Sequence, residues 1–502
     1  MSAAPAVSAA ARPDDFLRAA AAWVALLLER QIARARAGGL LPALAAAGDP
    51  LAGRYIGDPE LDRAARSVAA EQADVRALDD PAGASRAIRA AAEGLSLRMT
   101  AAVAADVPLP FQVVASRFQL TSDEQMLLLV LVVAALDPRV RRMVAYLQNH
   151  MARTRLDAGI ALALLRDDPE AGRLPWELLH PDGALRVHAL VHVDDDAHGR
   201  SLAERALSVP DGIVGFIARG ATWLDDEVAT FARVETPAVS WDELVWADAE
   251  RARLRQRIDQ ASHRVALTGE SGGLLLRGPA GAGKKTAVRA TCRALRRPLL
   301  VVDALRIPPA APVAVRCLRG ALRDARLHDA VVYLEHAEAL GADGGATLMA
   351  LTHLLQRGGQ LVFLGSERED RIAAEEALGL ASVRMPRLEV GERQQLWRST
   401  LPAALDPGGL AARRLAERYP LGPGDIVPVG ADAAAAARAR GGAILDEREL
   451  DRLVFERSRH NLSSIATPVR TRLTLDDVVL PPDVVERCKR IVQMVESQGT
   501  LA

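Results

Sequence analysis

The sequence has few aromatic residues, few cysteines and almost no net charge. Trp, Tyr and Phe make up 3% of its 502 residues, although 50% of all residues are hydrophobic. Cys292, Cys317 and Cys488 are scattered without the spacing of a metal site or a disulfide framework, which favours reduced thiols. The formal net charge of −1 excludes a global attraction to nucleic acid or to an anionic membrane. What is left is a globular protein, and its length predicts about two to four domains.

The sequence also lacks an apolar run that could span a bilayer. The longest run, residues 126–136, has 11 residues, whereas a transmembrane helix needs about 20. No basic segment precedes an apolar one at the N-terminus, so we predict no signal peptide. We expect a cytoplasmic protein with no membrane partner.

The first 108 residues are rich in alanine and are predicted to be helical. Residues 16–37 have the pattern of a helix with apolar residues available for burial, and polar helical segments follow over residues 59–73 and 85–105. Pro108 and Pro110 then interrupt the pattern. We therefore predict an Ala-rich helical region over residues 1–108.

Residues 109–235 carry a different pattern, which begins with an apolar helix. Ser122 and Gln125 have the three-residue spacing of a helix start, with Ser122 as the cap of that helix. Two more helices are predicted over residues 139–153 and 157–165.

A predicted hairpin follows these three helices. Apolar and polar residues alternate over residues 185–193, as in a strand, and residues 202–209 are its expected partner across a turn at 194–200. Three helices and a hairpin form a winged helix, in which the third helix would read DNA. Here the third helix, 157–165, is almost wholly apolar and has no Arg, Lys, Asn or Gln to contact base edges. We therefore expect a protein-contact module, and nucleic acid is an unlikely partner.

A glycine-rich segment lies between a predicted buried strand, 273–277, and a helix that continues to residue 295. Gly278, Gly283 and Lys284 have the P-loop spacing G-x-x-x-x-G-K. Such a loop curls so that its N–H groups bind phosphate oxygens, and the N-terminus of the next helix adds positive charge. We predict that ATP or ADP binds to this loop, with these residues as its contacts: Gly278, Pro279, Ala280, Gly281, Ala282, Gly283, Lys284, Lys285 and Thr286.

The residue after the P-loop lysine departs from the pattern. A Ser or Thr hydroxyl normally ligates Mg²⁺ there, but this chain has Lys285, with Thr286 one place later. An ammonium repels a metal ion, so phosphate binding is expected while Mg²⁺ binding is left open. Thr286 and Glu335 are the candidate metal ligands.

Three further buried strands are predicted over residues 299–303, 330–335 and 360–366, and a fifth strand over 383–386. The strand at 330–335 ends in Glu335-His336, where P-loop ATPases have Asp-Glu. Glu335 would meet a metal with its longer side chain. His336 is a poor match for the catalytic glutamate, so it is either a neutral base or a strand-end residue without a catalytic role.

Seven short stretches occur along the chain in a fixed order: Phe-Gln-Leu-Thr at 118–121, Leu-Asp-Pro-Arg at 136–139, Ala-Tyr-Leu-Gln at 145–148, Pro-Asp-Gly-Ala-Leu-Arg at 181–186, the P-loop, Glu-Arg-Gln-Gln-Leu-Trp at 392–397 and Leu-Asp-Asp-Val-Val-Leu-Pro at 475–481. In these stretches and their order, the chain resembles bacterial AAA+ ATPases with an N-terminal winged helix domain, of the type associated with contractile injection system loci.

The resemblance implies further features of the second half. It places a γ-phosphate-sensing polar residue at the end of the strand 360–366, which makes Ser366 a candidate contact of the nucleotide. It also implies an arginine finger between Arg371 and Arg384, where this sequence has no arginine. Longer members of the family carry a degenerate first ATPase module and an intact second one, and this chain matches the first. The chain is then a natural short form, a fragment, or a partner of an active module on another chain.

The predicted fold is mainly α with one α/β P-loop domain. An AAA+ core over residues 236–398 follows the winged helix domain, with a helical lid over 399–474 and a linker or tail over 475–502. Lid helices are predicted over 411–419, 425–439 and 446–462.

Three functions remain open from the sequence. The first is an ATP-binding module with weak or absent hydrolysis that serves the remodelling or assembly of a protein complex, with protein clients, a companion ATPase module or copies of itself as partners. The second is an active ATPase that forms its own ring and uses an atypical Mg²⁺ site. The third, disfavoured by the apolar third helix, is a nucleotide-gated DNA-binding regulator.

Overall fold

A computed structural model of the protein divides the chain into two units. The first unit comprises Met1–Arg233 and Val315–Asp329, and the second comprises Val234–Ala314 and Ala330–Ala502. The structure describes residues 13–41, 58–69, 81–150, 152–167, 173–194, 199–220, 223–341, 345–356, 358–368, 378–402, 406, 408–439, 447–462 and 481–497. Within these ranges, no helix is both long enough and apolar enough to cross a membrane.

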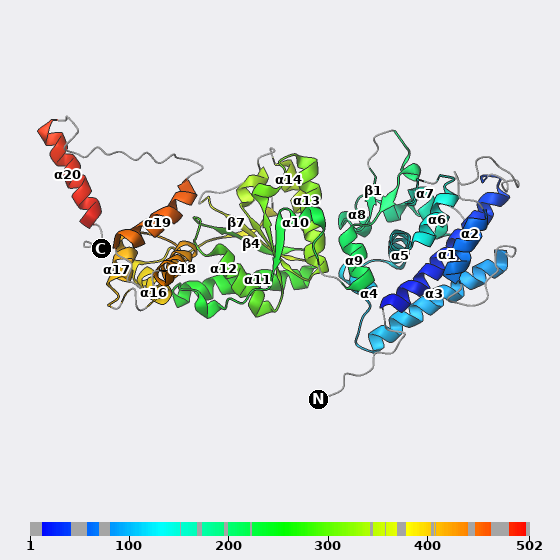
Figure 1. Cartoon of the computed structure of the whole chain (residues 1–502), viewed down its shortest axis with the longest axis horizontal. Coiled ribbons are helices and arrows are strands. Elements are labelled where there is room, and N and C mark those ends of the chain that lie inside the picture. The colour runs from blue at the N-terminus through cyan, green and yellow to red at the C-terminus, as the bar shows by residue number, and fades with distance from the viewer. Residues whose placement is uncertain are drawn as a thin grey trace. The chain divides into compact units, whose positions relative to one another are not determined.

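The first unit is almost entirely helical (Figure 1). Its elements are α1 (Pro13–Ala37), α2 (Asp58–Ala69), α3 (Pro81–Ala104), α4 (Pro110–Arg117), α5 (Ser122–Leu136), α6 (Pro138–Leu147), α7 (Ala158–Leu164), α8 (Ala184–Val187), β1 (His192–Val193), β2 (Leu207–Ser208), α9 (Asp211–Arg219) and α10 (Asp226–Ala229), together with most of α13 (Ala311–Leu327).

Helix α5 lies at the centre of the first unit. Every residue from Leu127 to Ala134 is buried, so the helix is apolar on all sides, as a fully enclosed helix must be. Helices α1, α6, α7, α8 and α9 pack around it. The apolar run 126–136 is therefore the core of a folded unit.

The Ala-rich N-terminal helices share this core. Helix α1 packs along α3, as Figure 1 shows, and also against α5, α6 and α9. Buried Arg30 of α1 donates to Asp167 Oδ1 at 2.6 Å and to Leu164 O at 2.8 Å, just beyond and at the end of α7. The expected boundary near residue 108 thus falls inside one compact unit. The helices predicted over 16–37 and 85–105 are present, and that over 59–73 is α2, with residues 70–73 outside the described residues.

The start of α5 differs by one residue from the prediction. Thr121, not Ser122, is the cap: its hydroxyl accepts from the Glu124 N–H at 3.3 Å. The Glu124 carboxylate in turn accepts from the Thr121 N–H at 2.9 Å. Thr121 and Glu124 have the same three-residue spacing as Ser122 and Gln125, so the pattern alone did not separate the two pairs.

The hairpin is present but is much shorter than predicted. His192 and Val193 of β1 pair antiparallel with Ser208 and Leu207 of β2. The strand prediction is wrong for residues 185–191: Ala184–Val187 is helix α8, and Ala189 has a left-handed φ of 49°. Residues Leu185, Val187, Ala189, Leu190 and Val191 are all buried, and a short apolar run that is buried this completely fits a helical turn as well as a strand.

The second unit is built on a six-stranded, mostly parallel sheet of order β3-β5-β6-β7-β4-β8. The strands are β3 (Ala232–Glu235), β4 (Gly272–Arg277), β5 (Leu299–Asp303), β6 (Val331–Glu335), β7 (Leu361–Ser366) and β8 (Ala381–Arg384). The helices of this unit are α11 (Asp248–Thr268), α12 (Lys284–Leu295), α14 (Ala346–Gln356), α16 (Val390–Thr400), α17 (Leu410–Arg418), α18 (Pro423–Ala439), α19 (Glu447–Leu462) and α20 (Pro482–Ser497).

The central strands are buried on both faces, which explains their continuous apolar sequences. One face, with Leu274, Leu276, Val301, Tyr333 and Phe363, shares a core with α11, α12 and the helices α16–α19. The strands predicted at 273–277, 299–303, 330–335 and 360–366 are confirmed to within a residue at each end, and the fifth lies at Ala381–Arg384, two residues earlier than predicted.

Helices α17–α19 lie in the range 399–474, which was predicted to be a helical lid, and α16 precedes them. The helices at Leu410–Arg418, Pro423–Ala439 and Glu447–Leu462 match the predicted ranges closely. The N–H of Gly424, at the start of α18, donates to Gly281 O at 2.9 Å, which ties the lid to the glycine-rich loop. Within the predicted tail, α20 covers Pro482–Ser497, and the stretch 475–480 lies outside the described residues.

Candidate functional site

The glycine-rich loop connects the carboxyl end of β4 to the start of α12. Two of its glycines adopt left-handed backbone angles that other residues rarely take, with φ of 75° at Gly281 and 87° at Gly283. A Cβ on Gly281 would lie 2.4 Å from Asp425 Oδ2, and one on Gly283 would lie 2.7 Å from Trp246 Cζ2. Both positions therefore require glycine for conformation and for space.

The loop aims several backbone N–H groups at one place. The first hydrogen bond of α12 runs from the Ala287 N–H to Gly283 O, at 2.9 Å. The N–H groups of Lys284, Lys285 and Thr286 precede that bond, so they point out of the helix end. The positive end of the helix macrodipole adds to their field, which makes this helix end suited to an anion.

A pocket of about 450 Å³ opens in front of these groups. It lies at the carboxyl ends of the parallel strands, where open α/β sheets bind ligands. Its lining residues are Ala280, Gly281, Ala282, Gly283, Lys284, Lys285, Thr286, Arg289, Tyr333, Glu335, His336, Gly365, Glu367, Gly424 and Asp425.

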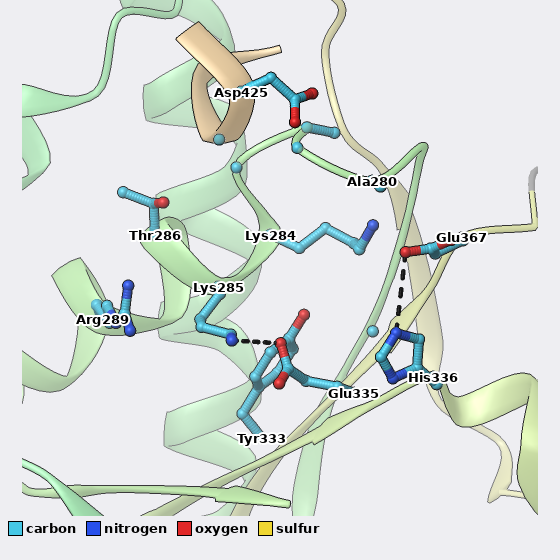
Figure 2. Close-up of a pocket in the computed structure, with 15 residues that line it drawn as sticks. Ala280, Lys284, Lys285, Thr286, Arg289, Tyr333, Glu335, His336, Glu367 and Asp425 are labelled. Atoms are coloured by element: carbon cyan, nitrogen blue, oxygen red, sulfur yellow. Dashed lines mark ion pairs between the residues drawn. The ribbon is translucent and has the colours of Figure 1, made fainter. Parts of the chain in front are cut away.

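Lys284 is folded back onto its own loop. Its ammonium donates to Gly278 O at 2.7 Å and to Pro279 O at 2.9 Å. Burial lowers its pKa, and the carboxylates of Glu367, Glu338 and Glu335 offset part of that effect. Figure 2 shows its side chain extending toward the side of the pocket where Glu367 lies. The two carbonyl contacts hold this cation at the pocket, and among the described residues it forms no ion pair.

Lys285 extends the other way, to the end of β6. Its Nζ lies 2.6 Å from Glu335 Oε1, and both side chains are shielded, at 28% and 19% exposed. Figure 2 shows Thr286 directed away from Glu335, on the far side of the helix start. Both residues predicted as metal ligands line the pocket, but it is the Lys285 ammonium that occupies the space beside Glu335.

His336 is held among carboxylates. Its Nδ1 lies 3.1 Å from Asp303 Oδ1, at the end of β5, and its Nε2 lies 3.9 Å from Glu367 Oε1 (Figure 2). The residue adopts a left-handed φ of 57°, which is uncommon for a side-chain-bearing residue. The chain turns sharply here and presents the ring, rather than a carboxylate, next to Glu335.

Ser366 does not line the pocket, and neither do two other predicted contacts, Gly278 and Pro279. It is fully buried, at 0% exposed, and its Oγ accepts from the Arg368 N–H at 3.1 Å. Its carbonyl accepts from the Gly278 N–H at 3.1 Å. The residues on either side, Gly365 and Glu367, reach the pocket instead. Ser366 thus contacts the first residue of the glycine-rich loop through its backbone and lies outside the pocket.

Sequence reasoning missed six polar or glycine contributors to the pocket: Arg289, Tyr333, Gly365, Glu367, Gly424 and Asp425. Two of them carried a usable signal. Arg289 lies four residues after Lys285 on the same helical face, and Tyr333 lies two residues before Glu335 on the same face of β6.

The other four contributors depend on the tertiary fold. Gly365 is required because a Cβ there would lie 2.3 Å from the Tyr333 hydroxyl. Asp425 comes from the lid, far away in the sequence. Of the segment between Arg371 and Arg384, where an arginine finger would lie, residues 372–377 fall outside the described residues.

Comparison with known proteins bears on the first unit. A family model described as "Winged helix domain, variant" matches residues 8–232. The N-terminal part of the chain is a winged helix domain. The match begins well before residue 109, in agreement with the core that α1 and α3 share with α5. An α/β domain with a mostly parallel sheet follows it. No curated protein matches the chain.

Helix α7, which matches the predicted third helix of the winged helix at 157–165, is buried. Four of its seven residues are fully buried, namely Ala158, Ala161, Leu162 and Leu164, and the other three are half-buried. A helix that reads DNA must project polar side chains into a groove. In this winged helix domain, α7 serves the core.

Proposed function

We propose that the α/β domain binds ATP or ADP in the pocket at the N-terminus of α12 and hydrolyses ATP weakly or not at all. The observation that carries the proposal is the combination of a curled glycine loop, a helix start with free N–H groups and the Lys284 ammonium, all at one 450 Å³ pocket. Phosphate oxygens would replace Gly278 O and Pro279 O as acceptors for Lys284.

Weak hydrolysis follows from two substitutions in the same pocket. A water-activating carboxylate contributes about 10² to 10⁴ in rate, and the position after Glu335 holds an imidazole bound to Asp303. The position that normally supplies a metal-ligating hydroxyl holds Lys285, paired with Glu335. Both substitutions remove help for the chemical step while leaving the phosphate-binding loop complete.

The proposed role is that of an ATP-binding AAA+ module in the remodelling or assembly of a protein complex. The resemblance to AAA+ ATPases of contractile injection system loci supports this role, as does a winged helix domain whose third helix is buried. A companion ATPase module, protein clients or further copies of the chain would then be its partners, with nucleotide binding as a structural or regulatory element.

Titration of the purified protein with ATP and ADP tests the binding step. Lys284→Ala is expected to weaken binding about tenfold or more, because a charge-assisted hydrogen bond is worth about 1.5–3 kcal/mol. Lys489→Ala, on exposed α20, is the matched control and should leave binding unchanged. Absence of binding to the unmodified protein would refute the proposal, and sustained ATP turnover that Lys284→Ala abolishes would refute the hydrolysis-deficient part of it.

A further inference from the structure

We infer that this site binds nucleotide without a divalent cation, because the Lys285 ammonium takes the place of Mg²⁺ next to Glu335. The inference rests on the proposed nucleotide site and specifies its cation chemistry. Three observations carry it: the Lys285–Glu335 pair, the donor set of the pocket and the use of lysine along the chain.

The Lys285–Glu335 pair puts a positive charge where a P-loop site holds its metal. Lys285 directly follows Lys284, the proposed phosphate-binding residue, and Glu335 is the acidic last residue of strand β6. Their 2.6 Å separation is that of a charge-assisted hydrogen bond. The ammonium neutralises Glu335, which would otherwise repel an incoming phosphate chain, and Lys285 itself lines the same pocket.

The donor set does not fit Mg²⁺. This ion demands near-octahedral oxygen coordination and is bound through one or two carboxylates, substrate phosphates and waters. Glu335 is engaged by Lys285, and the Thr286 side chain is directed away from it (Figure 2). Among the described residues, no group of three or more His, Cys, Asp or Glu side chains could hold a metal ion. A divalent cation beside Glu335 would also have to displace or repel an ammonium that is already there.

The choice of lysine at this position is itself informative. The chain contains 63 Lys and Arg residues, of which three are lysine: Lys284, Lys285 and Lys489. A chain that uses arginine nearly everywhere else has two adjacent lysines at the phosphate loop. An ammonium is a compact point charge, whereas a guanidinium is a broad planar fork. A compact cation is what the space between a phosphate and the Glu335 carboxylate requires in place of a metal ion.

The test is a fluorescence titration of the full chain with N-methylanthraniloyl-ADP, once with MgCl₂ and once with EDTA. For the unmodified protein the two dissociation constants should agree within about threefold. For Lys285→Thr, which restores a hydroxyl and removes the ammonium, the dissociation constant in EDTA should be at least about tenfold higher than in MgCl₂. Lys489→Thr is the matched control and should behave as the unmodified protein.

The outcomes separate this inference from the proposed function. Tight binding by the unmodified protein in MgCl₂ but not in EDTA would overturn the inference while the nucleotide site stands. Absence of binding under both conditions would overturn the proposed function, and the inference with it. If Lys285→Thr fails to fold, as judged by circular dichroism, the comparison of the unmodified protein in MgCl₂ and EDTA still decides.

Discussion

Lys284 and Lys285 are neighbours in sequence with opposite surroundings. Lys284 contacts two backbone carbonyls, whereas Lys285 contacts a carboxylate. The difference follows from position, because consecutive residues at a helix start point about 100° apart. One side chain is thus directed to the loop and the other to β6, so two chemically identical residues have different tasks in the proposed site.

The first prediction concerns pH and Lys284. Burial lowers the pKa of its ammonium below the usual lysine range, with Glu335, Glu338 and Glu367 acting less strongly in the other direction. Phosphate binds the protonated form, so affinity is complete below the lowered pKa and is lost as pH rises through it. We expect the dissociation constant of ADP to increase as the pH rises, at a pH below the usual lysine pKa of 10.5.

Isothermal titration calorimetry at increasing pH measures the effect. Lys284→Arg is the control, because a guanidinium stays charged throughout and should flatten the profile even if binding is weaker overall. A constant dissociation constant for the unmodified protein up to about pH 10.5 would contradict the assignment of Lys284 as the phosphate-binding cation.

At the scale of the element, the start of α5 is fixed by one side chain. The Thr121 hydroxyl accepts the Glu124 N–H, and Ser122 next to it is exposed and makes no such contact as a cap. Thr121→Ala should therefore lower the free energy of unfolding by about 1 kcal/mol, whereas Ser122→Ala should change it by less than about 0.5 kcal/mol. Urea denaturation of both variants, followed by circular dichroism, compares them directly. Equal losses, or a larger loss for Ser122→Ala, would show that the cap lies one residue later.

Some helices and strands were predictable from the sequence and others were not. Strands β4 to β7 were predictable because parallel strands buried on both faces leave short continuous apolar runs between turn signals. Residues 185–191 were not, because a buried helical turn leaves the same apolar residues as a strand. Helices α9, α13 and α14 were not predicted, and neither was β3 at the edge of the sheet.

The residues of the candidate site also fall into a group that the sequence predicts and a group that depends on the tertiary fold. The curled conformation of its glycine-rich loop was predictable from the sequence, because the spacing of glycines reflects backbone conformation. Tyr333 and Arg289 had periodicity in their favour. Asp425 reaches the pocket only because the lid folds over Gly281, and the burial of Ser366 depends on how β7 lies against β4. Neither fact is encoded locally.

At the scale of the whole molecule, the winged helix unit is discontinuous in sequence. Val315–Asp329, most of α13, belongs to the first unit although β5 and β6, on either side of it in sequence, belong to the sheet of the second. Buried Arg323 of α13 pairs with Asp225 Oδ2 at 3.0 Å, and Asp324 Oδ2 accepts from the Asp225 N–H at 2.9 Å. The first unit is complete only with this insert.

We therefore expect a fragment of residues 1–233 to be less stable than the same unit in the full chain. Loss of α13 removes the Arg323 partner of Asp225 and uncovers the surface that α13 covers in the first unit. Thermal unfolding by calorimetry of the fragment and of the full chain measures the difference. A full-length Arg323→Ala variant separates the ion pair from the rest of α13. A fragment that melts at the temperature of the first unit in the full chain would contradict the assignment.

The path of α13 restricts how this protein can be divided or recombined. A cut placed after β3 would appear to release an intact N-terminal domain, yet one helix of that domain would remain in the other piece. Transplanting the winged helix domain onto a different protein would require the α/β sheet to travel with it, or a redesigned surface where α13 lies. The two units are thus linked by the chain at three points, at residues 233–234, 314–315 and 329–330, and neither unit is one continuous segment.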